Sequence, residues 1–215
     1  KMKGLSNELG AALIFGSPAY KRINGKIRYY NRAYMITPDV TFTQYYDKRH
    51  LVPFGEYVPL KEYLPFISHL VQAAGNFAQG DRQSPLKDKD LSLGILICFE
   101  AIFPELARDL SREGTNLLVN ITNDAWFGAT SAPYQHLSMA VFRSVETGIP
   151  MIRAANTGFS AFIGSDGAIL SKTALFVEAV LSRSISLLPR APTIYTRTGD
   201  LFAGGLVLIS LLKLL

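Results

Sequence analysis

Residues 91–110, LSLGILICFEAIFPELARDL, place an apolar run directly before a run with helical spacing. The apolar part, 91–98, has the length and composition of a buried strand and carries Cys98, the only cysteine in the sequence. Pro104 stands where the first turn of a helix over 104–113 is expected, because that position needs no backbone N–H donor. This strand–turn–helix corner predicts an α/β fold with Cys98 exposed at the end of the strand.

The segments on either side of this corner repeat the alternation of strand and helix. Apolar runs at 115–122 (TNLLVNIT) and 150–156 (PMIRAAN) read as buried strands, and 134–148 (YQHLSMAVFRSVETG) reads as an amphipathic helix ended by glycine. Asn-Gly at 24–25 and Asp-Gly at 166–167 predict two hairpins, because such pairs accept the positive φ of tight turns. Strands, helices and hairpins together predict one α/β domain with a mixed sheet in these 215 residues.

Composition and charge limit the possible functions. Hydrophobic residues make up 48% of the sequence and charged residues 18%, which supplies a sizeable core and excludes a disordered chain. The formal net charge of +5 fits an anionic membrane surface or nucleic acid without requiring either. A single cysteine excludes an internal disulfide and a cysteine-based zinc cluster.

The other motif searches give no cofactor. His50, His69 and His136 lack the spacing of a metal site, so we expect no metal and read His69 and His136 as structural or surface residues. No GxSxG elbow, P-loop or GxGxxG occurs in the sequence, which leaves serine hydrolase and nucleotide-binding functions without support.

Cys98 is a candidate nucleophile. A helix that starts at the strand end supplies partial positive charge and free N–H groups, which favour a thiolate over a thiol. The N–H of Phe99 is placed to point at an oxyanion formed on an attacked carbonyl. The alternative is a small buried hydrophobe, which is what most lone cysteines are. Position alone leaves both readings open.

The stretch 45–59, YYDKRHLVPFGEYVP, is a second candidate for chemistry. Lys48 stands where a strand runs out, and Glu56 follows eight residues later in a loop that contains proline and glycine. An ammonium and a carboxylate held together on a rigid loop can stabilise an oxyanion and handle protons. The alternative is a solvated Lys-Arg pair next to a turn.

The two ends of the sequence are unusual. Residues 1–20 imitate a signal peptide, but Glu8 interrupts the short apolar run, so we read the tail of a helix followed by a strand. The end, 201–215 (LFAGGLVLISLLKLL), is almost wholly apolar but is shorter than the roughly 20 residues that span a bilayer. It reads either as a buried C-terminal helix or as a transmembrane helix cut short, with Gly199-Asp200 at its aqueous edge. We expect a fragment of a longer protein.

Five motifs carry a family resemblance: YDKRHLVPFGEYVP, GILICFEAIFPELARDL, NLLVNITNDAWFG, QHLSMAVFRSVETGIPMIRAANTGFSAFIGSDG and RTGD. Together they cover most of residues 10–200 and resemble the apolipoprotein N-acyltransferase family, within the nitrilase or carbon–nitrogen hydrolase superfamily. The resemblance implies a nitrilase-like α-β-β-α sandwich with mixed sheets over 1–198, truncated at its N-terminus. It also implies that 199–215 is the start of a C-terminal transmembrane helix.

The same resemblance assigns roles to the site residues. It implies that Cys98 is the nucleophile, Lys48 the oxyanion-stabilising lysine and Glu56 the second glutamate of the lysine loop. Glu100 matches a position that supports the site, beside the oxyanion-binding N–H of Phe99. The general-base glutamate of the superfamily triad is expected upstream of residue 1, which leaves open whether this chain alone is active.

Two further features have competing readings. Trp126 and Phe127 lie in a glycine-bearing loop and are expected to form a mobile lid that touches acyl chains, the alternative being ordinary packing. The hairpin around Asn24-Gly25 is basic and has the charge of a nucleic-acid-binding patch. No nucleic-acid-binding motif accompanies it, so a solvated face is expected. Its cations are Lys21, Arg22, Lys26 and Arg28.

By resemblance, the expected function is an N-acyltransferase of lipoprotein maturation. It would move a fatty acyl chain from a phospholipid through a Cys98 thioester to the N-terminal amine of a diacylglyceryl-modified apolipoprotein, without a cofactor. The catalytic domain would lie on the periplasmic side of the bacterial inner membrane. The alternatives are a soluble nitrilase-type amidase and an inactive fragment that lacks its general base.

Overall fold

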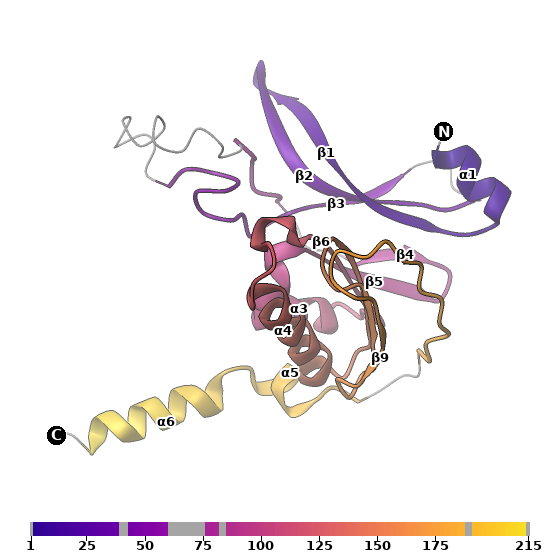
Figure 1. Cartoon of the computed structure of the whole chain (residues 1–215). Coiled ribbons are helices and arrows are strands. Elements are labelled where there is room, and N and C mark those ends of the chain that lie inside the picture. The colour runs from indigo at the N-terminus through magenta and orange to yellow at the C-terminus, as the bar shows by residue number, and fades with distance from the viewer. Residues whose placement is uncertain (1, 39–42, 60–75, 82–84, 188–190, 214–215) are drawn as a thin grey trace.

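The computed structural model describes residues 2–38, 43–59, 76–81, 85–187 and 191–213. Two sheets pack face to face, and the two longest helices of the folded body cover the outer face of the larger sheet (Figure 1). The elements in chain order are α1 (Met2–Leu9), β1 (Leu13–Ile23), β2 (Lys26–Ile36), β3 (Gln44–Asp47), β4 (Leu86–Asp88), β5 (Leu91–Ile97), the 3-10 helix η1 (Cys98–Ile102), α3 (Pro104–Arg112), β6 (Leu117–Asn123), the 3-10 helix η2 (Asp124–Phe127), α4 (Ala132–Thr147), β7 (Met151–Asn156), β8 (Ala161–Ile163), β9 (Ile169–Lys172), α5 (Ile194–Thr198) and α6 (Leu201–Leu212).

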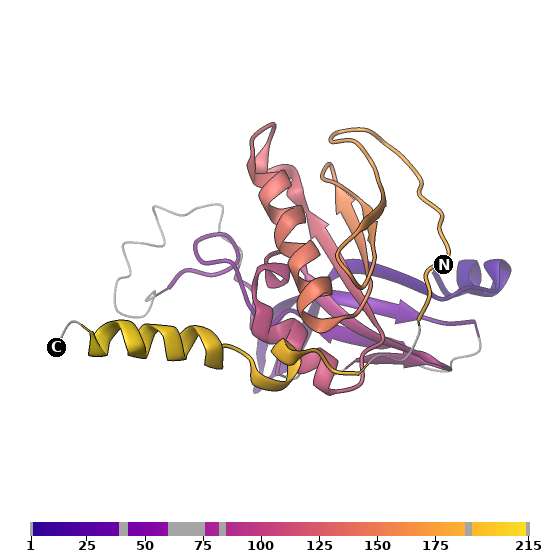
Figure 2. The same cartoon turned by 90° about the horizontal axis from the view of Figure 1, so that it is seen from below.

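The larger sheet has the strand order β4-β5-β6-β7-β8-β9. Its central strands β5, β6 and β7 are parallel, and the flanking pairs are antiparallel. Parallel neighbours need a crossover, and here α3 joins β5 to β6 while α4 joins β6 to β7. Both helices lie against one face of this sheet (Figure 2) and bury a shared core with it. Each parallel strand contributes one fully buried residue to this core, namely Leu96, Leu118 and Met151.

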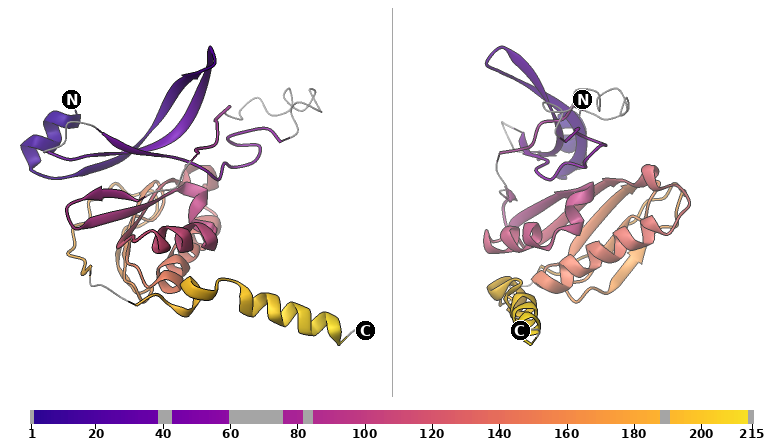
Figure 3. Two further views of the ribbon diagram at one scale, coloured as in Figure 1. Left: turned by 180° about the vertical axis from the view of Figure 1, so that it is seen from behind. Right: turned by 90° about the vertical axis from the view of Figure 1, so that its left-hand side faces the viewer.

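The smaller sheet is the antiparallel meander β1-β2-β3. Asn24 and Gly25 both have positive φ at the turn between β1 and β2, which confirms the hairpin predicted from the Asn-Gly pair. The two sheets form adjacent layers (Figure 3), joined by a second core in which Met35 and Tyr46 face Ile95 and Val119. The short helix α1 lies beside β2 at the N-terminal end of this sheet.

The α/β class with mixed sheets is confirmed, and two local predictions need correction. The helix predicted over 104–113 is confirmed as α3, which begins at Pro104, but the residues directly at the strand end form the 3-10 helix η1 and not the start of that helix. The stretch NDAWFG, expected as a plain loop, contains the 3-10 helix η2. His69 lies outside the described residues.

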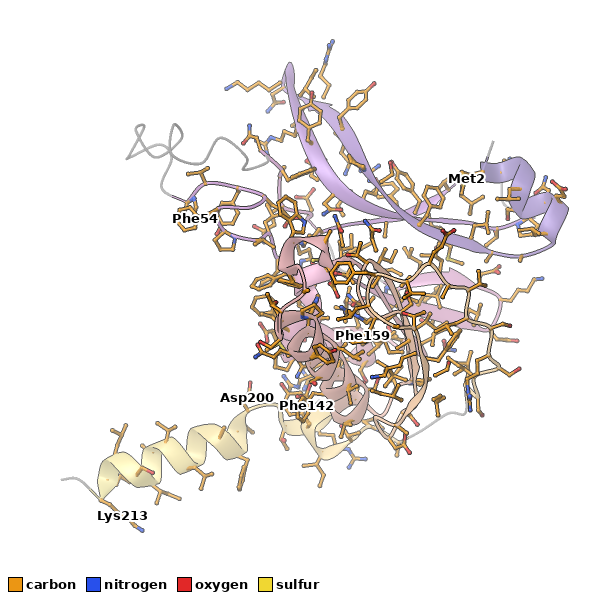
Figure 4. The ribbon with its side chains drawn as sticks, in the orientation of Figure 1. Met2, Phe54, Phe142, Phe159, Asp200 and Lys213 are labelled. Atoms are coloured by element: carbon orange, nitrogen blue, oxygen red, sulfur yellow. The ribbon has the colours of Figure 1, made fainter. Side chains whose placement is uncertain are left out.

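Helix α6 leaves the folded body and buries none of its residues. Helix α5 before it is held to α3, because Arg108 and Arg112 donate to the carbonyls of Thr196 and Arg197. Figure 4 shows the side chains of α6 radiating outward between Asp200 and the far end of the helix. The alternative of a buried C-terminal helix is therefore wrong. Across the described ranges, no helix has both the length and the apolar content needed to cross a bilayer.

Candidate active site

Cys98 occupies a strained turn at the end of β5. It is partly buried, and its φ of 52° is unusual for a residue with a side chain. Such a backbone persists only where the surroundings hold it. The carbonyl of Cys98 is held from two sides, because it accepts hydrogen bonds from Nε2 of His136 (3.2 Å) and Nδ2 of Asn120 (3.4 Å). The strand end and the left-handed turn together fix the position of the thiol.

Glu100 joins the nucleophile corner to the lysine loop. Its side chain is fully buried, and its two oxygens accept four hydrogen bonds. The donors are the Tyr46 hydroxyl (2.8 Å) and the backbone N–H groups of Arg49 (2.7 Å), His50 (3.1 Å) and Ile97 (2.7 Å). Two of these N–H groups come directly after Lys48, and one comes directly before Cys98. One carboxylate therefore holds the backbones of both candidate residues together.

The protonation of this carboxylate reflects two opposing effects. Burial raises the pKa of Glu100 above its ordinary value, and the hydrogen bonds donated to it by backbone N–H groups and Tyr46 offset only part of that rise. Burial also raises the pKa of Tyr46 strongly, and the neighbouring Glu100 carboxylate raises it further. Tyr46 consequently stays a neutral hydroxyl that donates to Glu100 across the working pH range.

Lys48 and Glu56 form the ion pair that the loop sequence predicts. The Lys48 side chain is 1% exposed, and its Nζ lies 2.7 Å from Oε2 of Glu56. Glu56 also accepts from the N–H of Val52 (2.8 Å) and from Nδ2 of Asn31 (2.8 Å). A buried ammonium is stable only when paired, so the loop is built around this contact. Asn31 additionally accepts the backbone N–H of Lys48 (2.8 Å), which ties the pair to β2.

A buried polar cluster supports the Cys98 turn from within the sheet. Its centre is Arg153 on β7, which is 1% exposed and donates to Oδ2 of Asp124 (2.7 Å) and to Oδ1 of Asn120. Its Nε donates to the carbonyl of Phe159 (3.2 Å), so each part of the guanidinium has an acceptor. His136 on α4 completes the cluster, with Nδ1 3.0 Å from Oδ1 of Asp124.

Both ring nitrogens of His136 have polar partners. The Cys98 carbonyl can only accept, so Nε2 of His136 carries the hydrogen that it donates there. Nδ1 lies 3.0 Å from Oδ1 of the Asp124 carboxylate, which can only accept, and 3.1 Å from Nη2 of Arg153, which can only donate. A chain of contacts therefore runs from Asp124 and Arg153 through His136 to the backbone of Cys98.

Electrostatics within this cluster favour a charged Asp124–Arg153 pair. Burial alone would raise the pKa of Asp124, but the hydrogen bond with His136 and the positive charge of Arg153 outweigh it, so this pKa lies below its ordinary value. Burial lowers the pKa of Arg153, against the attraction of Asp124.

The sequence-based reading missed this cluster. It read His136 as structural or surface, and the buried side chain confirms the structural reading, but it gave no role to Asn120, Asp124 or Arg153. A usable signal existed, because Asn120 and Arg153 are polar residues inside otherwise apolar strands, where unpaired polar side chains are costly. What the sequence could not provide was the strand register, which places Asn120 directly opposite Arg153.

The aromatic candidates differ in their surroundings. Trp126 is 77% exposed, whereas Phe127 packs edge-on against the ring of His136, with 5.7 Å between ring centres. Phe99 contacts Phe103 in the same edge-on manner, at 5.1 Å. Phe54, on the lysine loop, is also exposed and lies at the edge of the molecule in Figure 4. Within the described parts of the chain, no three His, Cys, Asp or Glu side chains are grouped to hold a metal ion.

Comparison with known proteins identifies several relatives. The profile of the carbon-nitrogen hydrolase family matches residues 1–193. The apolipoprotein N-acyltransferase of Geobacter metallireducens is 48% identical over 96% of this chain, and that of Rhodopseudomonas palustris is 44% identical over 87%. The chain covers 40% and 35% of the length of these two relatives.

Solved structures show the same fold at low identity. A carbon-nitrogen hydrolase from Helicobacter pylori G27 matches with a TM-score of 0.62 at 20% identity, covering 80% of this chain and 61% of that one. A Saccharomyces cerevisiae member of branch 10 of the nitrilase superfamily also matches with a TM-score of 0.62, at 17% identity, covering 81% of this chain and 59% of that one.

Proposed function

This chain belongs to the carbon–nitrogen hydrolase family and is a homologue of apolipoprotein N-acyltransferases, and from this premise we propose that its Cys98 carries a fatty acyl group between a phospholipid and a lipoprotein. The acceptor would be the N-terminal amine of a diacylglyceryl-modified apolipoprotein. The observation that supports this best is the Glu100 carboxylate, which holds the buried Lys48–Glu56 pair and the Cys98 turn together.

The first step is thioester formation. The Cys98 sulfur attacks the ester carbonyl of the phospholipid, and its proton passes to a general base. We propose that this base is a glutamate from the part of the longer relatives that this chain does not cover. The resulting oxyanion is stabilised by the Lys48 ammonium and the N–H of Phe99. The carbon–oxygen bond then breaks, and the lysophospholipid leaves after its oxygen takes up the proton.

The second step transfers the acyl group to nitrogen. The unprotonated α-amine attacks the thioester, the carbon–sulfur bond breaks, and the proton released by nitrogen returns to the Cys98 sulfur. A covalent acyl-enzyme predicts ping-pong kinetics. Glu56 holds Lys48 in place through both steps, and Trp126 with Phe127 would contact the acyl chain.

The placement in the cell is part of the same proposal. Residues 1–198 would form the catalytic domain on the periplasmic side of a bacterial inner membrane, and 199–215 would be the start of a membrane helix. The unburied, apolar α6 supports this placement, because exposed apolar side chains are unfavourable in water.

The proposal is tested by trapping the intermediate. The full-length protein that contains this chain is incubated with phospholipid alone, and the peptide containing Cys98 is examined by mass spectrometry. We expect an acyl adduct on Cys98 that disappears when a lipoprotein amine is added, and no adduct in Cys98→Ser. Absence of the adduct from the unaltered protein would contradict the mechanism, and loss of the adduct to water without an amine would indicate a hydrolase.

Lys48 has a separate expected effect. Replacing it with alanine removes one oxyanion donor, and such a loss costs roughly a hundredfold to a thousandfold in rate. The rate of Cys98 acylation under single-turnover conditions measures this loss. Lys48→Arg is the matched control, because it keeps the positive charge next to Glu56 but changes the donor geometry. An acylation rate in Lys48→Ala equal to that of the unaltered protein would remove Lys48 from the mechanism.

A further inference from the structure

The far half of the β1–β2 hairpin extends beyond the sheet that anchors it. β3 pairs with β2 only over residues 32–35, so residues 19–30 continue without a β3 neighbour. Besides the ion pair of Lys21 with Asp47, they are linked to another segment at Tyr29, which forms a bridge with Phe77 and whose carbonyl accepts the N–H of Ala78. Figures 1 and 3 show this end projecting from the body, away from α1 and β4. We call residues 20–29 the hairpin tip.

The hairpin tip combines unpaired cations with exposed aromatic and apolar side chains. It contains no acidic residue. Arg22, Lys26 and Arg28 are exposed, and none of the ion pairs in the described part of the chain includes them. Tyr20 and Tyr29 stand directly opposite each other on one face and are 71% and 51% exposed.

The remaining members of the tip complete this pattern. Ile27 lies opposite Arg22 on the same face as the tyrosine pair and is 49% exposed. Lys21, in contrast, turns back to Asp47, with Nζ 2.9 Å from Oδ2, and so belongs to the body. Tyr20, Tyr29 and Ile27 therefore expose apolar surface to water at the end of a projecting hairpin. This exposure is unfavourable unless a partner covers the three side chains.

We propose that the hairpin tip docks on the headgroup layer of an anionic lipid bilayer. Tyrosine is the residue type that favours the membrane–water interface, because its ring is apolar and its hydroxyl stays hydrated. Arginine and lysine next to it are attracted by the negative surface potential of anionic lipids. Ile27 adds an apolar side chain that can contact lipid but gains nothing from the charged backbone of a nucleic acid.

The contact at Tyr29 connects the tip to the neighbourhood of the candidate site. In Figure 1 the tip projects at the top of the view and α6 at the lower left, and α1 lies at the right. Tyr29 also contacts the segment that follows the lysine loop, so a docked tip would set the height of that loop above the lipid. This inference is linked to the proposed function at one point: the phospholipid acyl donor would come from the bilayer on which the tip docks.

Flotation with lipid vesicles tests the charge part. The full chain is mixed with vesicles of phosphatidylcholine alone or with phosphatidylglycerol added. The apolar α6 is expected to contribute equally to both kinds, so the ratio of the two affinities reports on charge. In Arg22→Gln/Lys26→Gln/Arg28→Gln, we expect the preference for anionic vesicles to fall on the order of a hundredfold at low salt. The matched control removes three exposed lysines on the opposite side, Lys3→Gln/Lys87→Gln/Lys89→Gln, and should change the preference far less.

Two outcomes would overturn the proposal. One is an equal loss in both triple variants, which would mean that net charge alone directs binding. The other is tighter binding of the unaltered chain to an oligonucleotide than to anionic vesicles at the same salt concentration. Raising the salt concentration should weaken the preference of the unaltered chain and leave that of the hairpin variant nearly unchanged, since exposed charges are screened.

Fluorescence tests the contact itself. Trp126 is the only tryptophan, so Tyr20→Trp in a Trp126→Phe background places one reporter at the tip. We expect a blue shift and quenching by shallow brominated lipids on adding anionic vesicles, and unchanged emission would overturn the proposal. These readouts are independent of acyl transfer. A chain that acylates Cys98 but shows neither effect refutes only the docking, whereas docking without a Cys98 adduct refutes only the proposed function.

Discussion

At the scale of single residues, the left-handed backbone of Cys98 carries the most information. A side-chain-bearing residue with a φ of 52° costs about 1–3 kcal/mol, so the protein must hold it there. The hydrogen bond from His136 to the Cys98 carbonyl is part of what holds it. Under the proposed function, His136 is a positioning residue, because it contacts the backbone of Cys98.

Replacing His136 separates positioning from folding. In His136→Leu the donor to the Cys98 carbonyl is lost, and we expect kcat to fall about tenfold to a hundredfold with little change in KM, as for a small displacement of a reacting group. His136→Gln retains a side-chain N–H donor and should recover part of that loss. Steady-state kinetics of the three proteins give the comparison. A matching loss in the Leu and Gln variants would show that the donor is irrelevant.

Asp124 predicts how stability depends on pH. Its folded-state pKa lies below the ordinary value of 3.8, so its stabilising contribution is present above pH 3.8 and is lost as the pH falls through the lower folded value. Asp124→Asn leaves Arg153 buried without its counter-charge and should cost about 3–5 kcal/mol of unfolding free energy at neutral pH. Denaturant unfolding from pH 7 to pH 2 should show this difference shrinking below pH 3.8. A difference that stays constant would contradict the assigned ionisation.

At the scale of elements, η2 and the end of β7 are packed closely together, with Asp124 of η2 lying against Gly158 just after β7. A Cβ at this position would lie 2.2 Å from Oδ2 of Asp124, and Asp124 cannot move without breaking its contact with Arg153. Gly158→Ala should therefore destabilise the fold by about 1–3 kcal/mol through overpacking. Gly4→Ala in α1 is the control, since nothing lies within 4 Å of its Cβ, and it should be neutral or slightly stabilising. Thermal unfolding of both variants measures the contrast.

The elements were the part of the fold best predicted from the sequence. The strand before Cys98, the helix over 104–113 and the Asn-Gly hairpin follow from hydrophobic period and turn chemistry, which are local properties. The Lys48–Glu56 pair could be predicted for the same reason, because both residues lie on one short loop. The Asn120–Arg153 contact could not, because it depends on the register between two strands that are far apart in sequence.

At the scale of the whole molecule, α6 is attached to the fold without contributing to its core. None of its residues is buried. Removing 201–215 should therefore change the free energy of unfolding by no more than about 0.5 kcal/mol, as for substitutions away from the core, and leave the midpoint of thermal unfolding nearly the same. The same truncation should raise solubility and weaken binding to neutral vesicles, because it removes the apolar surface. Calorimetry and flotation measure the two effects. A marked drop in the unfolding temperature would show that α6 packs on the body.

The hydrogen bonds accepted by Glu100 make the chemistry at Cys98 depend on how the two sheets are packed together. Lys48 follows a strand of the small sheet, whereas Cys98 ends a strand of the large one, and Glu100 spans the seam between them. The reactivity of the Cys98 thiol should therefore depend on the relative position of the two sheets. A small displacement of one layer against the other would prevent the proposed reaction at Cys98 while every strand and helix stayed intact.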